Sequence, residues 1–153
     1  MYYIFYAFFY LLSLLPWRVF YIISDFFAFI LQYVVKYRVD VVAKNLAIAF
    51  PDKSVAERKK IANAFYQKFT DSFVETIKFI SISTREYEKR FTSNVEVLND
   101  LYDTGQSVQI MAGHFFNWEY ANWGVAKYGK YPFLAVYMPL SNGFFDKMIL
   151  QMR

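Results

Sequence analysis

His114 and Glu119 are the two side chains whose types and spacing best suit proton transfer, with Phe-Phe-Asn-Trp between them. An imidazole with an ordinary pKa of about 6.5 takes a proton from a hydroxyl at physiological pH. A carboxylate bonded to the other ring nitrogen fixes the tautomer and stabilises the imidazolium that forms. We therefore interpret His114 as a candidate general base and Glu119 as its orienting partner. An isolated pair at this spacing also occurs by chance, and a lone histidine beside aromatic residues is often a packing or capping residue.

The sequence lacks the residues that several other kinds of catalytic site require. The sequence has no cysteine, which removes thiolate nucleophiles, disulfides and Cys-ligated zinc. His114 is the single histidine, which excludes a multi-histidine metal site. A metal held by carboxylates alone is the remaining alternative, but no spacing indicates one, and we predict no metal. A hydrolase that pairs His114 with a serine is a weaker alternative, because no serine lies in a G-x-S-x-G turn. Direct attack of an acceptor hydroxyl on a thioester carbonyl needs no protein nucleophile and fits these absences.

The elements that must position this pair are predicted from apolar patterns. Residues five apart on an unbroken helix point about 140° away from each other, so His114 must lie in a turn and Glu119 in a helix's first turn. Short apolar runs at 107–112 and 133–138 predict strands, and 117–127 predicts a helix between them. A strand, a helix and a strand form a βαβ unit. We therefore predict an α/β fold with a parallel sheet and a right-handed crossover.

The middle of the chain predicts helices. Residues 38–49 form one, and 84–90 and 95–102 form two shorter ones. Ser54 and Glu57 have capping-box spacing and open a long helix. An apolar stripe follows this helix at intervals of three or four residues: Ile61, Phe65, Phe69, Phe73, Ile77 and Ile80. Such a stripe is by default a core-packing face, and the alternative is that it lies on lipid or borders an acyl chain.

The N-terminal segment predicts a membrane anchor. Residues 2–35 carry only Arg18 and Asp25 as formal charges, and 19–35 has about the length needed to cross a hydrocarbon core of roughly 30 Å. Pro16 ends or kinks the first helix, so the anchor is a membrane helix or a kinked hairpin, and the number of crossings stays open. A cleaved signal peptide and a buried hairpin of a soluble protein are the alternatives.

Composition and charge agree with a membrane protein. Apolar residues make up 57% and aromatic residues 23% of the chain, and the net charge is +4. Basic residues follow the anchor closely and place the rest of the chain in the cytoplasm by the positive-inside tendency. The positive charge suits anionic lipid head groups. No basic cluster is interleaved with aromatic residues as in a nucleic-acid groove, so we predict the membrane as a partner and no nucleic acid.

Several sequence blocks occur together and in a fixed order. They are Leu15-Pro16, Arg38 with Lys44-Asn45-Leu46, Ala49-Phe50-Pro51, Glu57-Arg58, Gly113-His114 through Asn117-Trp118-Glu119, and Tyr137, Pro139-Leu140 and Asn142. Together they resemble the lysophospholipid acyltransferase-like enzymes, and specifically the N-terminal half of the bacterial lipid A late acyltransferases. The blocks cover nearly the whole chain, which makes the resemblance far more specific than His114 and Glu119 alone.

The resemblance implies an activity and its partners. A fatty acyl group would move from an acyl carrier protein or coenzyme A thioester to a hydroxyl of a membrane glycolipid, such as a lipid A precursor. The reaction would take place on the cytoplasmic side of the bacterial inner membrane and would need no cofactor apart from the acyl donor. His114 and Glu119 would be catalytic, and the residues binding the acyl acceptor would be Phe116, Asn117, Tyr137 and Pro139.

The resemblance also implies a domain organisation. Residues 1–36 would be the membrane anchor, 37–104 a helical region, and 105–153 the first βαβ part of the catalytic domain. Met138 stands where many relatives carry an arginine, which removes one electrostatic contact to a phosphorylated acceptor. Relatives continue well beyond the position of Arg153, so we expect this fragment alone to be inactive. The rival hypothesis is a non-catalytic membrane-bound protein that binds or assembles lipid.

Overall fold

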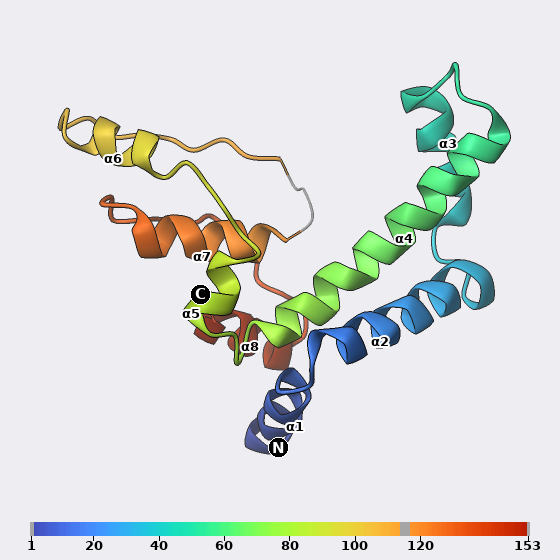
Figure 1. Ribbon diagram of the computed structural model, residues 1–153, viewed down its shortest axis with the longest axis horizontal. Coiled ribbons are helices and arrows are strands. Elements are labelled where there is room, and N and C mark those ends of the chain that lie inside the picture. Colours follow the sequence, from blue (N-terminus) through green and yellow to red (C-terminus); the bar gives the residue numbers. More distant parts are fainter. Residues whose placement is uncertain (1, 114–116, 153) are drawn as a thin grey trace. The chain divides into compact units, whose positions relative to one another are not determined.

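The computed structural model describes residues 2–113 and 117–152, and its helices fall into two compact units (Figure 1). One unit is Leu15–Ile77, and the other combines Met1–Leu14 with Lys78–Arg153. The helices are α1 (Tyr2–Ser13), α2 (Trp17–Phe29) with a π-helical continuation (Ile30–Val34), α3 (Val39–Ala49), α4 (Val55–Lys78), α5 (Thr84–Glu88), α6 (Glu96–Tyr102), α7 (Trp118–Tyr128) and α8 (Gly143–Met152). The predicted helices at 38–49, 84–90, 95–102 and 117–127 are confirmed. The predicted domain boundaries after residues 36 and 104 stay predictions.

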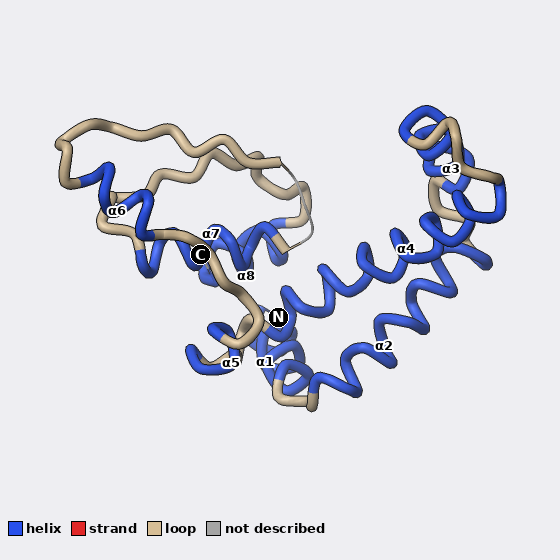
Figure 2. The backbone as a smooth tube through the Cα atoms, turned by 45° about the horizontal axis from the view of Figure 1, so that its top comes forward, coloured by secondary structure: helices blue, strands red, loops and turns tan. Residues whose placement is uncertain are grey.

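The predicted α/β fold class is wrong for the part of the chain that the structure describes. Residues 2–113 and 117–152 form helices and loops and contain no β-strand (Figure 2). Both predicted strands, 107–112 and 133–138, are loops, so the parallel sheet and its right-handed crossover are absent there too. An apolar run shows only which residues would suit a strand, whereas a strand exists through hydrogen bonds to a neighbour. Apolar side chains of these loops stay exposed, including Met111 and Leu134.

A polar ladder joins α2 and its π-helical end to α4 in the unit 15–77. We use this name for three side-chain pairs whose members bond to each other: Tyr21 with Glu75 at 2.7 Å, Ser24 with Asp71 at 2.7 Å, and Gln32 with Asn63 at 2.6 Å. Ser24 is fully buried, and its hydroxyl oxygen also lies 3.0 Å from the Thr70 hydroxyl oxygen. Hydrogen bonds between helices are a common means of association in a lipid environment. The ladder therefore fixes the two helices as an antiparallel pair.

Apolar side chains lie on the outside of this helix pair. The buried face of α4 includes Tyr66, Thr70 and Val74, whereas Phe73 of the predicted stripe is 56% exposed. The remaining stripe residues on α4 are only half-buried. On α2, Ile22 and Phe26 are likewise exposed. The stripe within this unit is therefore partly packed against protein, and the choice between core packing and contact with lipid stays a prediction.

Residues 17–34 have the length and apolar composition of a membrane-crossing helix, alone among the described helices. Only 17% of this span is buried, whereas the core helix of a soluble protein would be mostly buried. The span agrees with the predicted membrane segment 19–35. Its exposed apolar surface favours a membrane-spanning segment over the buried hairpin of a soluble protein.

The predicted capping box at the start of α4 is confirmed. Glu57 accepts the Ser54 backbone N–H at 2.8 Å, and its own N–H donates to the Ser54 hydroxyl at 3.3 Å. These bonds satisfy N–H groups that have no partner inside the helix. Hydrogen bonds from Ser54 lower the pKa of Glu57.

Replacing Ser54 by alanine is expected to lower the free energy of unfolding by about 1 kcal/mol, because the helix loses its N-cap. The lowered pKa means that the cap stabilises the protein above the unfolded carboxyl pKa of about 4.3 and loses this effect as pH falls through the folded value. Thermal melts followed by circular dichroism at pH 7 and at pH 3 measure both effects. The exposed loop residue Ser93 gives a control, and equal melts for Ser93→Ala and Ser54→Ala at pH 7 would contradict the prediction.

Helix α1 is tied to the end of α4 within the unit that contains both segments. Ser13 is fully buried, and its carbonyl accepts the Lys78 ammonium at 2.6 Å and the Ser81 hydroxyl at 2.9 Å. These donors satisfy a carbonyl that α1 leaves without a helical partner at its C-terminal end. A cation at that end also interacts favourably with the helix dipole. Burial lowers the pKa of Lys78, which agrees with an ammonium held among protein groups.

Candidate functional site

The first turn of α7 carries the described part of the predicted catalytic pair. Glu119 lies in this turn, as predicted, and accepts the Trp118 indole N–H at 3.2 Å. Asn117 occupies the N-cap position with φ of 67°, a left-handed conformation that asparagine tolerates better than most residues. Its side chain makes no capping hydrogen bond. A carboxylate in the first turn interacts favourably with the helix dipole.

Two of the predicted site residues, His114 and Phe116, lie outside the described residues. The pairing of His114 with Glu119 therefore stays a prediction from the sequence. The structure contributes the position of Glu119, its contact with Trp118 and the conformation of Asn117. The assignment of Phe116 to the acceptor pocket also stays a prediction.

An aromatic core holds α7 in place and thereby positions Glu119. Tyr87 of α5 is 1% exposed and stacks on Tyr120 with ring centroids 5.6 Å apart. Its hydroxyl donates to the Tyr120 carbonyl at 2.7 Å, and burial raises the pKa of Tyr87. Phe79 and Trp123 complete the contact, with their rings 5.7 Å apart. Because Tyr120 is the next residue after Glu119, this core restrains the turn that carries the carboxylate.

Polar contacts tie the other end of α7 to α5. The Lys127 ammonium donates to the Thr84 hydroxyl at 2.8 Å, and the Tyr128 hydroxyl donates to Glu88 at 2.7 Å. The Lys127 ammonium also lies 4.2 Å from the ring centroid of Trp123, a cation–π distance. Helix α7 is thus fixed along its whole length by α5 and the aromatic core. A catalytic carboxylate benefits from such support, because small displacements reduce catalysis strongly.

The other predicted acceptor residues lie in the loop that follows α7. Tyr137 is 39% exposed, and Pro139 is also exposed. Figure 1 shows the chain turning back after α7 and reaching α8 near the N-terminal end of α7, where Glu119 lies. This loop therefore returns toward the first turn of α7 without a sheet. The roles of Asn117, Tyr137 and Pro139 in acceptor binding stay predictions.

No sequence pattern predicts the contacts that support Glu119. The indole of Trp118 is adjacent in sequence, but a donor to the neighbouring carboxylate has no spacing pattern that would reveal it. The partner of Tyr120 is Tyr87, 33 residues away, and only tertiary structure brings the two together. The high content of aromatic residues indicates that aromatic packing will occur, but it does not show which rings contact each other.

A carboxylate held on a fixed helix and predicted to orient a histidine is suited to acid–base catalysis, which points to enzymes that move a proton during the reaction. The comparison with known families is specific. The chain matches the family model described as bacterial lipid A biosynthesis acyltransferase over residues 1–153. No curated protein and no solved structure gives a significant match.

Because the match covers the whole sequence, the chain belongs to the bacterial lipid A biosynthesis acyltransferase family. The resemblance seen in the sequence blocks is thereby confirmed. The protein is an acyltransferase enzyme of lipid A biosynthesis, and its family implies a glycolipid acceptor.

Proposed function

We propose that this acyltransferase moves a fatty acyl group from an acyl carrier protein or coenzyme A thioester to a hydroxyl of a lipid A precursor, on the cytoplasmic side of the inner membrane. The family match carries the class of reaction and the class of acceptor. The observation that carries the catalytic assignment is the position of Glu119 in the fixed first turn of α7. His114 is the general base, and Glu119 orients it.

The reaction needs two proton transfers, one from the acceptor hydroxyl to His114 and one from His114 to the leaving thiolate. His114 removes the proton of the acceptor hydroxyl while the oxygen of that hydroxyl attacks the thioester carbonyl carbon. The new carbon–oxygen bond forms and the carbon–sulfur bond breaks, and the imidazolium returns its proton to the leaving thiolate. The products are an ester and a free thiol, so the atoms balance without a protein nucleophile. Glu119 stabilises the imidazolium between the two transfers.

The membrane location is supported by the N-terminal helices and by charge. Residues 17–34 can span a bilayer by length and composition, and their apolar side chains are largely exposed. Basic residues follow this span in the sequence, which favours the cytoplasmic side for the remainder. Both the glycolipid acceptor and the acyl chain of the donor are then available at one face of the membrane.

The Glu119→Gln variant tests the orienting role. The expected result is a loss of acyl transfer of about a hundredfold or more, because an amide does not hold the histidine tautomer or stabilise its charge as a carboxylate does. All variants are made in the complete reading frame that encodes this chain, because the fragment alone is expected to be inactive. The assay follows radiolabelled acyl groups from each thioester donor to a lipid A precursor in membranes. Glu96→Gln is the matched control, since Glu96 is the acidic residue in the first turn of α6. Equal activities of the two variants would refute the role of Glu119.

A further inference from the structure

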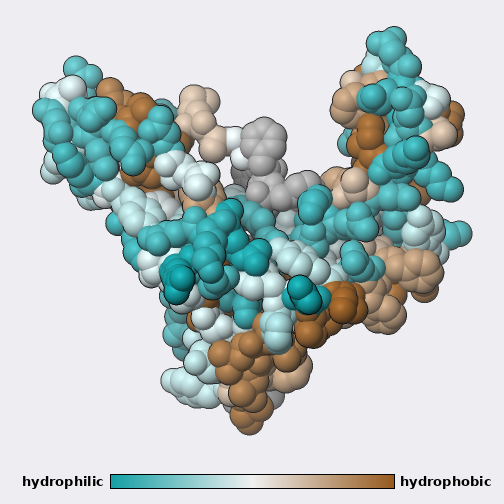
Figure 3. Space-filling view, viewed as in Figure 1, coloured by the Kyte–Doolittle hydropathy of each residue, from teal (hydrophilic) through white to brown (hydrophobic). Residues whose placement is uncertain are grey.

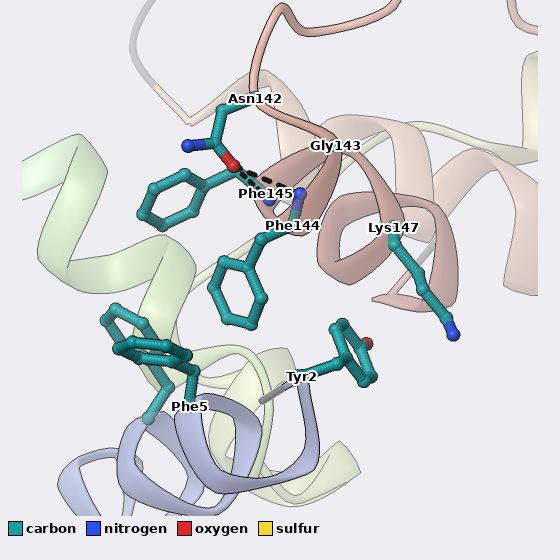
Figure 4. A pocket seen from close by; sticks show the side chains of 8 residues that line it. Tyr2, Phe5, Asn142, Gly143, Phe144, Phe145 and Lys147 are labelled. Carbon is teal, nitrogen blue, oxygen red and sulfur yellow. Dashed lines mark hydrogen bonds between the residues drawn. The ribbon is translucent and has the colours of Figure 1, made fainter.

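A cavity of about 570 Å³ lies between α1 and α8, which belong to the same compact unit. This volume falls in the range of about 300–1,000 Å³ that is typical of small-molecule sites. It shares no residue with the predicted catalytic site. Its lining is Tyr2, Phe5, Phe9, Asn142, Gly143, Phe144, Phe145 and Lys147 (Figure 4).

Aromatic rings from both helices form the walls of this cavity. The Phe144 ring of α8 lies with its centroid 5.4 Å from that of Tyr2, 5.6 Å from that of Phe5 and 6.0 Å from that of Phe9. The ring of Phe145 contacts Phe9 from the same side, at 6.0 Å. Walls of this kind favour an apolar occupant, because burying its surface removes it from water.

Apart from the Tyr2 hydroxyl, which donates to Gln151, the polar side chains of the lining lie on the α8 side of the cavity. The Asn142 side-chain oxygen accepts the backbone N–H of Phe144 at 3.0 Å and thereby fixes the first turn of α8. Lys147 is the one charged residue in the lining, and its ammonium lies 4.3 Å from the Tyr2 ring centroid. No acidic residue lines the cavity. The chemistry of the walls therefore fits an amphiphile with an apolar chain and an anionic group.

The other face of α1 points to a bilayer as the source of this amphiphile. Tyr3, Ile4 and Leu11 are exposed on it, and Figure 3 shows apolar side chains gathered over α1 at the bottom of the view. A helix of 12 residues is about 18 Å long, too short for a hydrocarbon core of roughly 30 Å. An apolar helix of this length fits the boundary between head groups and acyl chains. Anionic phospholipids are amphiphiles that a membrane offers at that depth.

We propose that the cavity between α1 and α8 binds one acyl chain of an anionic phospholipid, with the lipid phosphate paired to Lys147. The aromatic walls hold the chain, and the ammonium selects the negative head group over a zwitterionic one. This site goes beyond the proposed acyl transfer, because its lipid is a bound membrane component and is neither the donor nor the acceptor.

Quenching by brominated lipids tests the proposal. The full chain with Phe144→Trp is placed in phosphatidylcholine vesicles that contain brominated phosphatidylglycerol or, in parallel, brominated phosphatidylcholine. The fluorescence of the introduced tryptophan is obtained by subtracting the fluorescence of the unsubstituted chain, which has three tryptophans of its own. Brominated phosphatidylglycerol is expected to quench this fluorescence at a several-fold lower mole fraction than brominated phosphatidylcholine. Lys147→Ala is expected to abolish this preference.

Lys130→Ala is the matched control, because it removes the same charge from an exposed pair with Asp103. It should retain the preference for phosphatidylglycerol. Phe5→Trp serves as the reporter on the opposite wall if Phe144→Trp does not fold. Equal quenching by both lipids, or an unchanged preference in Lys147→Ala, would overturn the proposal. Quenching by a brominated acyl thioester but not by phosphatidylglycerol would overturn it too, by assigning the cavity to the donor. The His114→Ala variant should bind phosphatidylglycerol normally, so loss of catalysis and loss of this site are distinguishable.

Discussion

Replacing His114 by alanine is expected to lower the rate of acyl transfer by about a hundredfold to ten-thousandfold, the usual contribution of a general base. The acceptor hydroxyl would then have to lose its proton to water, at a rate that rises with hydroxide concentration. The residual activity should therefore increase with pH, and the inflection near the histidine pKa should vanish from the pH profile. Transfer of a labelled acyl group to a lipid A precursor, measured from pH 5 to pH 9, gives both quantities.

The amount of protein in the membrane must be equal for this comparison. Quantitative immunoblotting of membrane fractions provides the correction, and His114→Gln repeats the test with a side chain closer in size to histidine. Full activity in either variant would refute the assignment of His114 as the general base. A loss of activity with an unchanged pH profile would also count against it, because a purely structural defect leaves the inflection in place.

Truncating Tyr87 to alanine is expected to lower the free energy of unfolding by about 3–5 kcal/mol, the usual cost of removing a large buried aromatic side chain. The ring is 1% exposed and contacts Phe79, Tyr120 and Trp123. Its loss should also release α7, so activity should fall through displacement of Glu119. Thermal unfolding and amide hydrogen exchange of α7 measure the two effects. Tyr102→Ala is the control, since Tyr102 is 42% exposed.

Gly124 provides a second probe of the same core. A Cβ at this position would meet the Tyr87 hydroxyl and would lie 2.9 Å from a ring carbon of Phe91. Gly124→Ala should therefore destabilise the protein by about 1–3 kcal/mol, the cost of overpacking. Tyr87→Phe removes the hydroxyl, so it should relieve part of this cost when combined with Gly124→Ala. Strictly additive effects of the two substitutions would contradict the proposed packing.

The helices were predictable because their signals are local. Ser54 and Glu57 lie three residues apart, and their reciprocal hydrogen bonds form within one turn. The proline and glycine residues between helices also act on their own neighbours. The predicted strands failed for the opposite reason, since a sheet depends on pairing between distant segments. Apolar character at 133–138 gave no information about whether a partner strand would be present.

The face of α4 that becomes buried could not be read from its apolar periodicity. The stripe through Phe65, Phe69 and Phe73 identifies an apolar face, but it does not say whether protein or lipid covers that face. Burial instead follows the side that bonds to α2, where Thr70 and Asp71 lie. Polar side chains that pair across an interface are individually inconspicuous in a sequence. Their partners are 30 to 54 residues away.

The candidate site was predictable in part. Its spacing placed Glu119 in the first turn of a helix, and the structure confirms that position. Asn117 occupies the N-cap position of that helix, where it adopts a left-handed conformation and makes no side-chain capping bond. The chemistry of His114 depends on residues outside the described part of the chain. The aromatic support from Tyr87 depends on tertiary packing and was out of reach.

The polar ladder has a consequence for alignment. Its pairs recur along the helices, so sliding α2 by one turn would separate Ser24 from Asp71 and Gln32 from Asn63 at the same time. The buried Ser24 and Asp71 would then lose each other as partners away from water, at a cost that generic apolar contacts would not impose. The ladder therefore selects a single alignment of α2 and its π-helical end against α4.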